Sequence, residues 1–126
     1  MTALTPGRNQ PNTDLVFTPD YLVDKLIEHY KPTGKILDPA KGAGAFYNKL
    51  PGEVDWCEIS EGRDFLLYKG SADWIFTNPP WSKMRAFLNK SMTIAPDIMF
   101  LVTITHVVTK ARLRDIVKAG YGLREF

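Results

Sequence analysis

The stretch K-I-L-D-P-A-K-G-A-G-A-F, from Lys35 to Phe46, decides the fold. Its first four residues indicate a short strand that ends at Asp38. Gly42 and Gly44 follow in a tight loop, where glycine permits close turning of the backbone and close approach of a ligand. Residues 45–50 then predict the start of a helix. A strand, a glycine-bearing loop and a helix in this order are typical of a parallel α/β sheet.

Outward from this stretch, the chain keeps alternating between the two kinds of element. Apolar residues at helical spacing predict a helix over 19–30. The segments that predict further strands are 54–59, 73–77 and 97–104, and those that predict helices are 83–94 and 109–119. The segment 97–104 is the most hydrophobic, so we expect it to be buried on both faces. Residues 123–126 can begin one more strand.

Length and composition favour one domain of ordinary globular character. The chain has 126 residues, 44% of them hydrophobic and 24% charged. We expect a flexible arm over 1–14 and a single domain over 15–126. No apolar run reaches the ~18 residues that a membrane helix needs, so we expect no membrane partner. The single cysteine, Cys57, favours a core position in a reducing compartment, and we expect a cytoplasmic protein.

The charge is distributed unevenly along the chain. Residues 1–80 hold 8 Lys and Arg against 11 Asp and Glu, whereas residues 81–126 hold 8 against 3. A basic C-terminal third can approach phosphates, and it can equally be a solvated helix face. Lys110, Arg112 and Arg114 are the candidates for phosphate contact.

The loop after the first strand predicts a nucleoside ligand. Glu58 lies 20 residues beyond Asp38, a spacing that suits a carboxylate that binds ribose hydroxyls. The full G-x-G-x-x-G string of dinucleotide sites is absent, and so are the lysine and hydroxyl of a P-loop. Asp38 would repel a pyrophosphate but would attract an ammonium group. These charges favour S-adenosylmethionine over NAD, while a generic turn without a ligand stays the simpler alternative.

The segment D-W-I-F-T-N-P-P-W, from Asp73 to Trp81, ends an apolar strand in a rigid polar turn. Proline cannot donate to a sheet ladder, so Pro79 and Pro80 stop the strand at the sheet edge where α/β proteins bind ligands. The Asn78 side-chain oxygen and the Pro79 carbonyl could accept both hydrogens of a planar amine such as the adenine amino group. Trp81 could stack on the base. A strand terminator beside a core tryptophan is the alternative.

Together these motifs resemble the S-adenosylmethionine-dependent amino-methyltransferases, most closely the adenine-N6 DNA methyltransferases. The resemblance implies a Rossmann-like class I methyltransferase sheet, with DNA as the partner. F-T-P is similar to the first cofactor motif, D-P-A-K-G-A-G-A-F to the glycine motif and G-R-D-F to the segment that contacts the adenine of the cofactor. The cofactor-binding residues that it implies are Phe17, Thr18, Pro19, Asp38, Pro39, Ala40, Gly42, Gly44, Glu58, Asp64 and Phe65. The catalytic residues that it implies are Asn78, Pro79, Pro80 and Trp81.

Two departures from the family pattern matter. Glu58 and Asp64 are six residues apart, too close for a helical crossover, so the usual helix is missing or Phe65–Tyr68 is a loop that replaces a strand. The chain also ends early, which predicts a sheet truncated at its C-terminal edge and open to a homodimer or a separate recognition subunit. Two alternative functions stay open: methylation of a protein glutamine amide, and a non-catalytic binding subunit.

Overall fold

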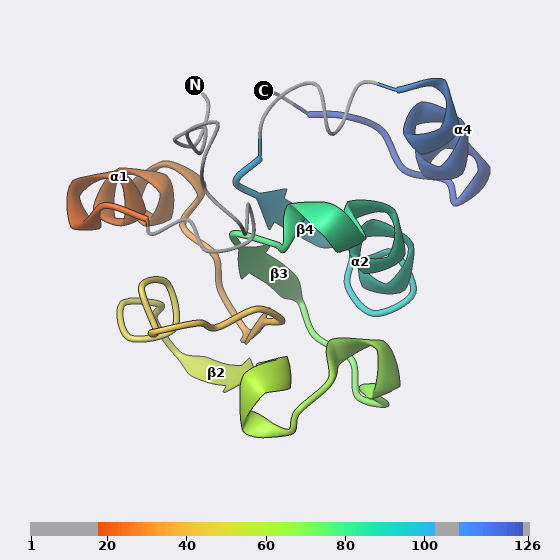
Figure 1. Cartoon of the computed structure of the whole chain (residues 1–126). Coiled ribbons are helices and arrows are strands. Elements are labelled where there is room, and N and C mark those ends of the chain that lie inside the picture. Colours follow the sequence, from red (N-terminus) through yellow and green to blue (C-terminus); the bar gives the residue numbers. More distant parts are fainter. Residues whose placement is uncertain (1–17, 103–108, 125–126) are drawn as a thin grey trace, which may run out of the picture.

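The computed structural model describes residues 18–102 and 109–124. Figure 1 shows helices on both sides of a central sheet. The helices are α1 (Asp20–Tyr30), α2 (Met84–Ser91) and α4 (Lys110–Lys118), and the strands are β1 (Lys35–Asp38), β2 (Glu53–Trp56), β3 (Trp74–Thr77) and β4 (Asp97–Phe100). Three short 3₁₀ turns complete the order: η1 (Ile59–Glu61), η2 (Phe65–Leu67) and η3 (Trp81–Lys83).

All four strands pair in parallel, in the order β2-β1-β3-β4. The chain moves from β1 to one side to form β2, and then returns to the other side of β1 to form β3. The crossing direction therefore reverses between β1 and β3. Parallel α/β sheets bind ligands at such a reversal, beyond the carboxyl ends of the strands.

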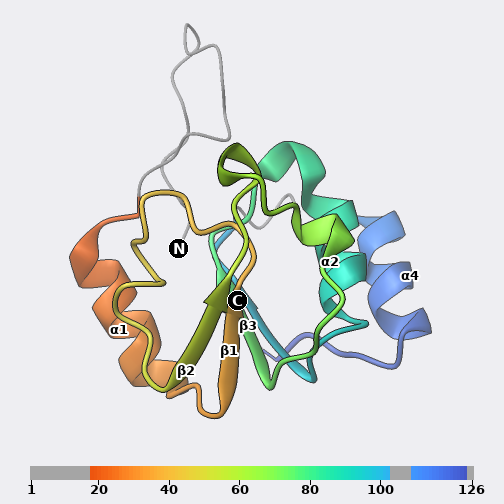
Figure 2. The same cartoon turned by 90° about the horizontal axis from the view of Figure 1, so that it is seen from below.

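The sheet separates two apolar clusters, because successive strand residues face opposite sides. Ile36 and Phe76 face the cluster beneath α1, whereas Leu37 and Ile75 face the cluster beneath α2. Figure 2 shows α1 on one side of the strands and α2 on the other, with α4 outside α2. The expected α/β class with a parallel, Rossmann-like sheet is thus confirmed at this level.

Most of the expected elements are present, with shifted ends. The helices expected over 19–30, 83–94 and 109–119 match α1, α2 and α4. The expectation that 97–104 is buried on both faces holds in part for the residues that the structure describes: Met99 and Leu101 are buried in the cluster beneath α1, and Ile98 and Phe100 are half-buried against the cluster beneath α2. β4 pairs with β3 alone among the described strands, whereas β3 lies between β1 and β4 and all four of its residues are buried.

The helix expected from Ala45 does not form. Gly42 and Gly44 have positive φ values of 56° and 95°, and Pro51 follows closely. Between them, isolated turns carry the chain, through bonds such as Asn48 N–H to the Gly44 carbonyl at 2.9 Å and Leu50 N–H to the Phe46 carbonyl at 2.9 Å. Six residues between two breakers are too few to offset the cost of nucleating a helix. Phe46 is nevertheless buried beneath α1.

The segment from Glu58 to Tyr68 forms no α-helix and no strand. Glu58 and Arg63 bond each other by paired backbone bonds of 2.9 and 3.1 Å, and the short 3₁₀ turn η2 occupies Phe65–Leu67. Both alternatives from the sequence therefore hold: the usual helix is missing between Glu58 and Asp64, and 65–68 forms no strand. Residues 121–124 form no strand. The predictions for the arm, Phe17, 103–104 and 125–126 concern residues outside those that the structure describes.

Candidate functional site

The carboxyl ends of β1 and β3 meet through a buried polar pair. Asp38 ends β1 and is 1% exposed, and Thr77 ends β3 and is fully buried. The Thr77 hydroxyl donates to Asp38 Oδ1 at 2.6 Å, and the Ala40 N–H donates to the same oxygen at 3.2 Å. A carboxylate thus lies at the reversal point between the two central strands, at the depth of the core.

Burial controls the ionisation of Asp38. Loss of solvent raises its pKa to about 7, although the hydrogen bonds from Thr77, Ala40 and the Tyr47 backbone lower it. The negative charge of Glu58 adds to the rise. The hydrogen bonds thus do not offset the full burial of Asp38, so a bound cation would stabilise the charged form of this carboxylate.

The pKa of Glu58, just beyond β2, is shifted in the opposite direction to that of Asp38. Its Oε1 accepts the Gly42 N–H at 2.8 Å, and its Oε2 accepts the Ser60 N–H at 3.1 Å and the Ser60 hydroxyl at 2.8 Å. Burial raises the pKa of Glu58, but these bonds and the charge of Lys41 outweigh it and lower the pKa overall. A carboxylate offers about four acceptor positions, so three donors leave room for one more.

The glycine loop spans the space between Asp38 and Glu58. Its backbone is tied to the end of β2 by Lys41 N–H, which donates to the Cys57 carbonyl at 2.9 Å. The positive φ of Gly44 favours glycine, and a side chain there would also require the exposed Asn48 amide, 2.6 Å away, to turn aside. Pro39 is buried and Ala40 half-buried in the same loop.

The N-P-P-W segment lies next to this pair, because Asn78 directly follows Thr77. The Asn78 Nδ2 donates to Thr18 Oγ1 at 3.1 Å, which ties β3 to the start of α1, where Pro19 is the N-cap residue. The Oδ1 of the same amide is then its acceptor group. Pro79 is buried, and Trp81 is 8% exposed at the start of η3.

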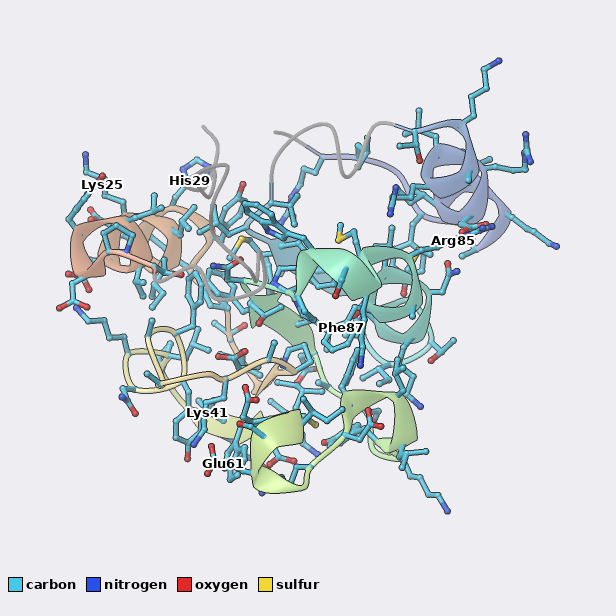
Figure 3. All side chains as sticks on the ribbon, viewed as in Figure 1. Lys25, His29, Lys41, Glu61, Arg85 and Phe87 are labelled. Atoms are coloured by element: carbon cyan, nitrogen blue, oxygen red, sulfur yellow. The ribbon has the colours of Figure 1, made fainter. Side chains whose placement is uncertain are left out.

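Asp64 and Phe65, both expected to bind the cofactor, make contacts within the fold. Asp64 accepts the Leu66 N–H at 2.9 Å and so caps η2. Phe65 is 1% exposed and its ring lies 4.9 Å from that of Phe87, which points from α2 toward the sheet in Figure 3. Cys57 is buried as expected, and burial raises its thiol pKa to about 11, which disfavours a thiolate.

The sequence interpretation missed Thr77 and the group around Trp56. A hydroxyl at the end of an otherwise apolar strand, beside the predicted catalytic turn, would have been the signal for Thr77. The Trp56 ring lies between two cations, with Lys41 Nζ and the Arg63 guanidinium carbon each 4.1 Å from its centroid. Lys41 also pairs with Glu61 at 3.0 Å, and both are labelled beside β2 in Figure 3.

In comparisons with known proteins, no family model matches the chain and no curated protein shows significant similarity to it. In the described ranges 18–102 and 109–124, no helix has the length and apolar character that crossing a membrane requires. In the same ranges, His, Cys, Asp and Glu form no group of three or more that could hold a metal.

Proposed function

We propose that the protein transfers a methyl group from S-adenosylmethionine to the exocyclic N6 amino group of adenine in DNA. The observation that supports this most strongly is the buried Asp38–Thr77 pair at the reversal point of the sheet, directly before N-P-P-W. It combines an acidic group for a cationic ligand with a rigid turn that carries acceptors for an amine.

The chain's own residues fit the proposed cofactor. Asp38 is a buried carboxylate whose hydrogen bonds do not offset its burial, and the ammonium group of the cofactor would provide the missing positive charge. Glu58 keeps one acceptor position for a ribose hydroxyl beside its three protein donors. Engaging both hydroxyls would require Gly42 or Ser60 to give up its bond, which links ribose binding to the position of the glycine loop.

The amide of Asn78 supports the role of acceptor for the target amine. With Nδ2 donating to Thr18, its Oδ1 and the Pro79 carbonyl can each accept one hydrogen of the adenine amino group. The cofactor supplies an activated methyl sulfonium when bound, so the protein needs to align the two groups rather than to provide a strong base. Trp81 is 8% exposed, so stacking on the base requires its ring to turn outward.

The direct test follows a labelled methyl group from the cofactor into plasmid DNA. Asn78→Ala is expected to lower transfer at least ~100-fold, because the acceptors act mainly as charge develops, yet to keep cofactor binding by calorimetry. The control is Thr33→Ala, an exposed residue at the opposite edge of the sheet.

Three outcomes would contradict the proposal. Near-wild-type transfer by Asn78→Ala would remove the role of the amide. Label that enters only a protease-sensitive fraction of a cell extract would replace DNA with a protein amide. Cofactor binding without transfer to any nucleic acid would favour a binding subunit.

A further inference from the structure

A second feature, separate from the buried pair, lies between α2 and α4. It is an open groove of about 440 Å³ lined by Ser82, Lys83, Arg85, Ala86, Asn89 and Arg112. Lys83, Arg85 and Arg112 are cations, and no acidic residue lines the groove. Ser82 and Lys83 follow Trp81 directly through η3, so the groove begins one residue beyond the proposed catalytic turn.

The walls of the groove are fixed by contacts between the two helices. Arg85 Nε donates to Asp115 Oδ2 at 2.8 Å, and Asn89 Nδ2 donates to the same oxygen at 3.2 Å. Figure 3 shows Arg85 on the side of α2 that faces α4. Beyond α4, the Tyr121 hydroxyl donates to the carbonyl of Ala95 at 2.6 Å, which holds the chain after α4 against the end of α2. The groove is therefore part of the packed structure.

Two of its cations have no acidic partner among the described residues. Arg85 is paired with Asp115, but neither Lys83 nor Arg112 forms an ion pair with any residue in 18–102 or 109–124. Arg112 donates from one terminal nitrogen to the Thr109 hydroxyl at 3.4 Å, while its buried Nε has no hydrogen-bond partner within the described ranges. An unsatisfied buried donor is costly, and a small turn of the guanidinium toward a bound anion would satisfy it.

The dimensions fit a chain of anions rather than a single one. Along η3 and α2 the groove runs from Ser82 to Asn89, about 10 Å at roughly 1.5 Å per residue. Phosphates of one DNA strand repeat every ~3.4 Å along the helix axis, so about three of them span this length. Arg and Lys side chains together with Ser and Asn donors are the usual contacts to phosphate oxygens.

We propose that the α2–α4 groove binds the phosphate backbone of DNA beside the catalytic turn, with Lys83 and Arg112 as the contacting cations. The choice of DNA as ligand rests on the proposed function. The contacts are to the backbone, so they hold the DNA in position without reading its sequence.

The test measures binding of a fluorescein-labelled DNA duplex by anisotropy between 50 and 200 mM salt, without cofactor. Lys83→Glu/Arg112→Glu is expected to weaken binding roughly 10- to 100-fold near 0.1 M salt and to lower the slope of log affinity against log salt by about 2. The matched control Lys25→Glu/Lys69→Glu makes the same change in net charge on residues outside the groove, and it is expected to alter affinity less than ~3-fold. Lys25 points away from the groove at the outer side of α1 (Figure 3).

A milder variant guards against misfolding. Lys83 is exposed, so Lys83→Ala is expected to keep the wild-type melting temperature and to lower the slope by about 1. Equal losses in the groove variant and the matched control would overturn the inference, as would tighter binding of a single-stranded RNA of the same length through the same residues. Wild-type protein that does not bind the duplex at 50 mM salt would overturn it as well.

The inference and the proposed function fail separately. Asn78→Ala is expected to bind the duplex like the wild type. If the wild type transfers methyl groups and the groove variants bind DNA as well as the wild type does, the groove inference is wrong and the proposed function stands. If the wild type transfers no methyl group but binds DNA through the groove residues, the proposed function is wrong and the groove inference stands.

Discussion

Asp38 and Glu58 end neighbouring parallel strands, yet the structure drives their ionisation in opposite directions. Asp38 is almost fully buried, and its pKa rises to about 7 although hydrogen bonds from Thr77, Ala40 and the Tyr47 backbone oppose the rise. Glu58 is half-buried, also has three donors, and its pKa falls. Position in the sheet therefore does not decide the charge of a carboxylate. With three donors to each acid, the depth of burial decides it.

The difference assigns unlike tasks to two acids that the sequence places in one proposed site. Glu58 is charged at neutral pH in the absence of ligand and already organises the glycine loop through Gly42. Asp38 is poised between its two protonation states near neutral pH, so it responds to a cation. In the proposed site, Glu58 would thus be the fixed element, and Asp38 the element that ligand binding completes.

The largest expected effect comes from Asp38→Asn, which removes the charge but keeps an oxygen for Thr77. The unfolded chain ionises Asp38 near its ordinary 3.8, while the folded protein keeps the proton until about pH 7. The protonated carboxyl of Asp38 therefore contributes its full stabilisation below about pH 4, and this contribution is lost as the pH rises through about 7. At pH 8 the variant is expected to be more stable by on the order of 4 kcal/mol, and at pH 4 similar, by urea unfolding.

The same variant is expected to bind S-adenosylmethionine at least ~100-fold more weakly at pH 8, because the ammonium group loses a buried partner. In the wild type, the affinity is expected to fall below pH 7 and binding to release a proton, which calorimetry in buffers of different ionisation enthalpy detects. If neither the wild-type affinity for the cofactor nor the free energy of unfolding changes with pH, then Asp38 does not titrate near pH 7 as the structure indicates.

Thr77→Val is expected to have the next largest effect. It preserves the shape of the side chain but removes the 2.6 Å hydrogen bond to Asp38. Loss of a bond to a buried charged group is expected to cost about 1–3 kcal/mol at pH 8 by urea unfolding. The pKa of Asp38 is expected to rise further, so the pH midpoint of cofactor binding moves upward. An unmoved midpoint would contradict the pairing, and Thr93→Val, whose hydroxyl is exposed and bonds only locally, is the control.

Glu58→Gln is expected to have the smallest effect of the three. The amide keeps one acceptor oxygen, but its nitrogen cannot accept from Gly42 or Ser60. Cofactor affinity is expected to fall roughly 10-fold, the value of about one lost hydrogen bond to a charged group. The pH midpoint set by Asp38 is expected to shift only slightly downward, since the charge of Glu58 is a minor cause of the raised pKa. A loss as large as that of Asp38→Asn would erase the distinction between the two acids.

The sequence was sufficient for the elements whose pattern is local. The spacing of apolar residues located α1, α2 and α4, and adjacent apolar residues located β3. The sequence-based prediction failed where tertiary contacts determine the element or its burial. Residues 45–50 read as helical, but the two positive-φ glycines and Pro51 leave too few residues for one. The segment 97–104 is more apolar than β3, yet burial follows from strand order, which periodicity does not encode.

The site was predictable in its residue types but not in its energetics. Asp38, Glu58 and Asn78 were expected at strand ends, and the structure places them there. Thr77 was missed because its importance comes from its contact with Asp38 across 39 positions of sequence. The opposite pKa shifts also depend on depth of burial and on backbone donors, neither of which a residue name reveals.

An aspartate fixes each end of the β1–β3 pair. At the amino end, Asp73 Oδ2 accepts the Lys35 N–H at 2.8 Å while the Asp73 N–H bonds the Lys35 carbonyl, and at the other end Asp38 holds Thr77. These contacts join segments nearly 40 residues apart, so they arise only after a long loop has closed during folding. A nascent chain that stops before Trp74 carries the whole glycine loop but lacks the partner strand. During folding, the chain would therefore bind a small molecule only after β3 has paired with β1, so binding would indicate that the sheet has formed.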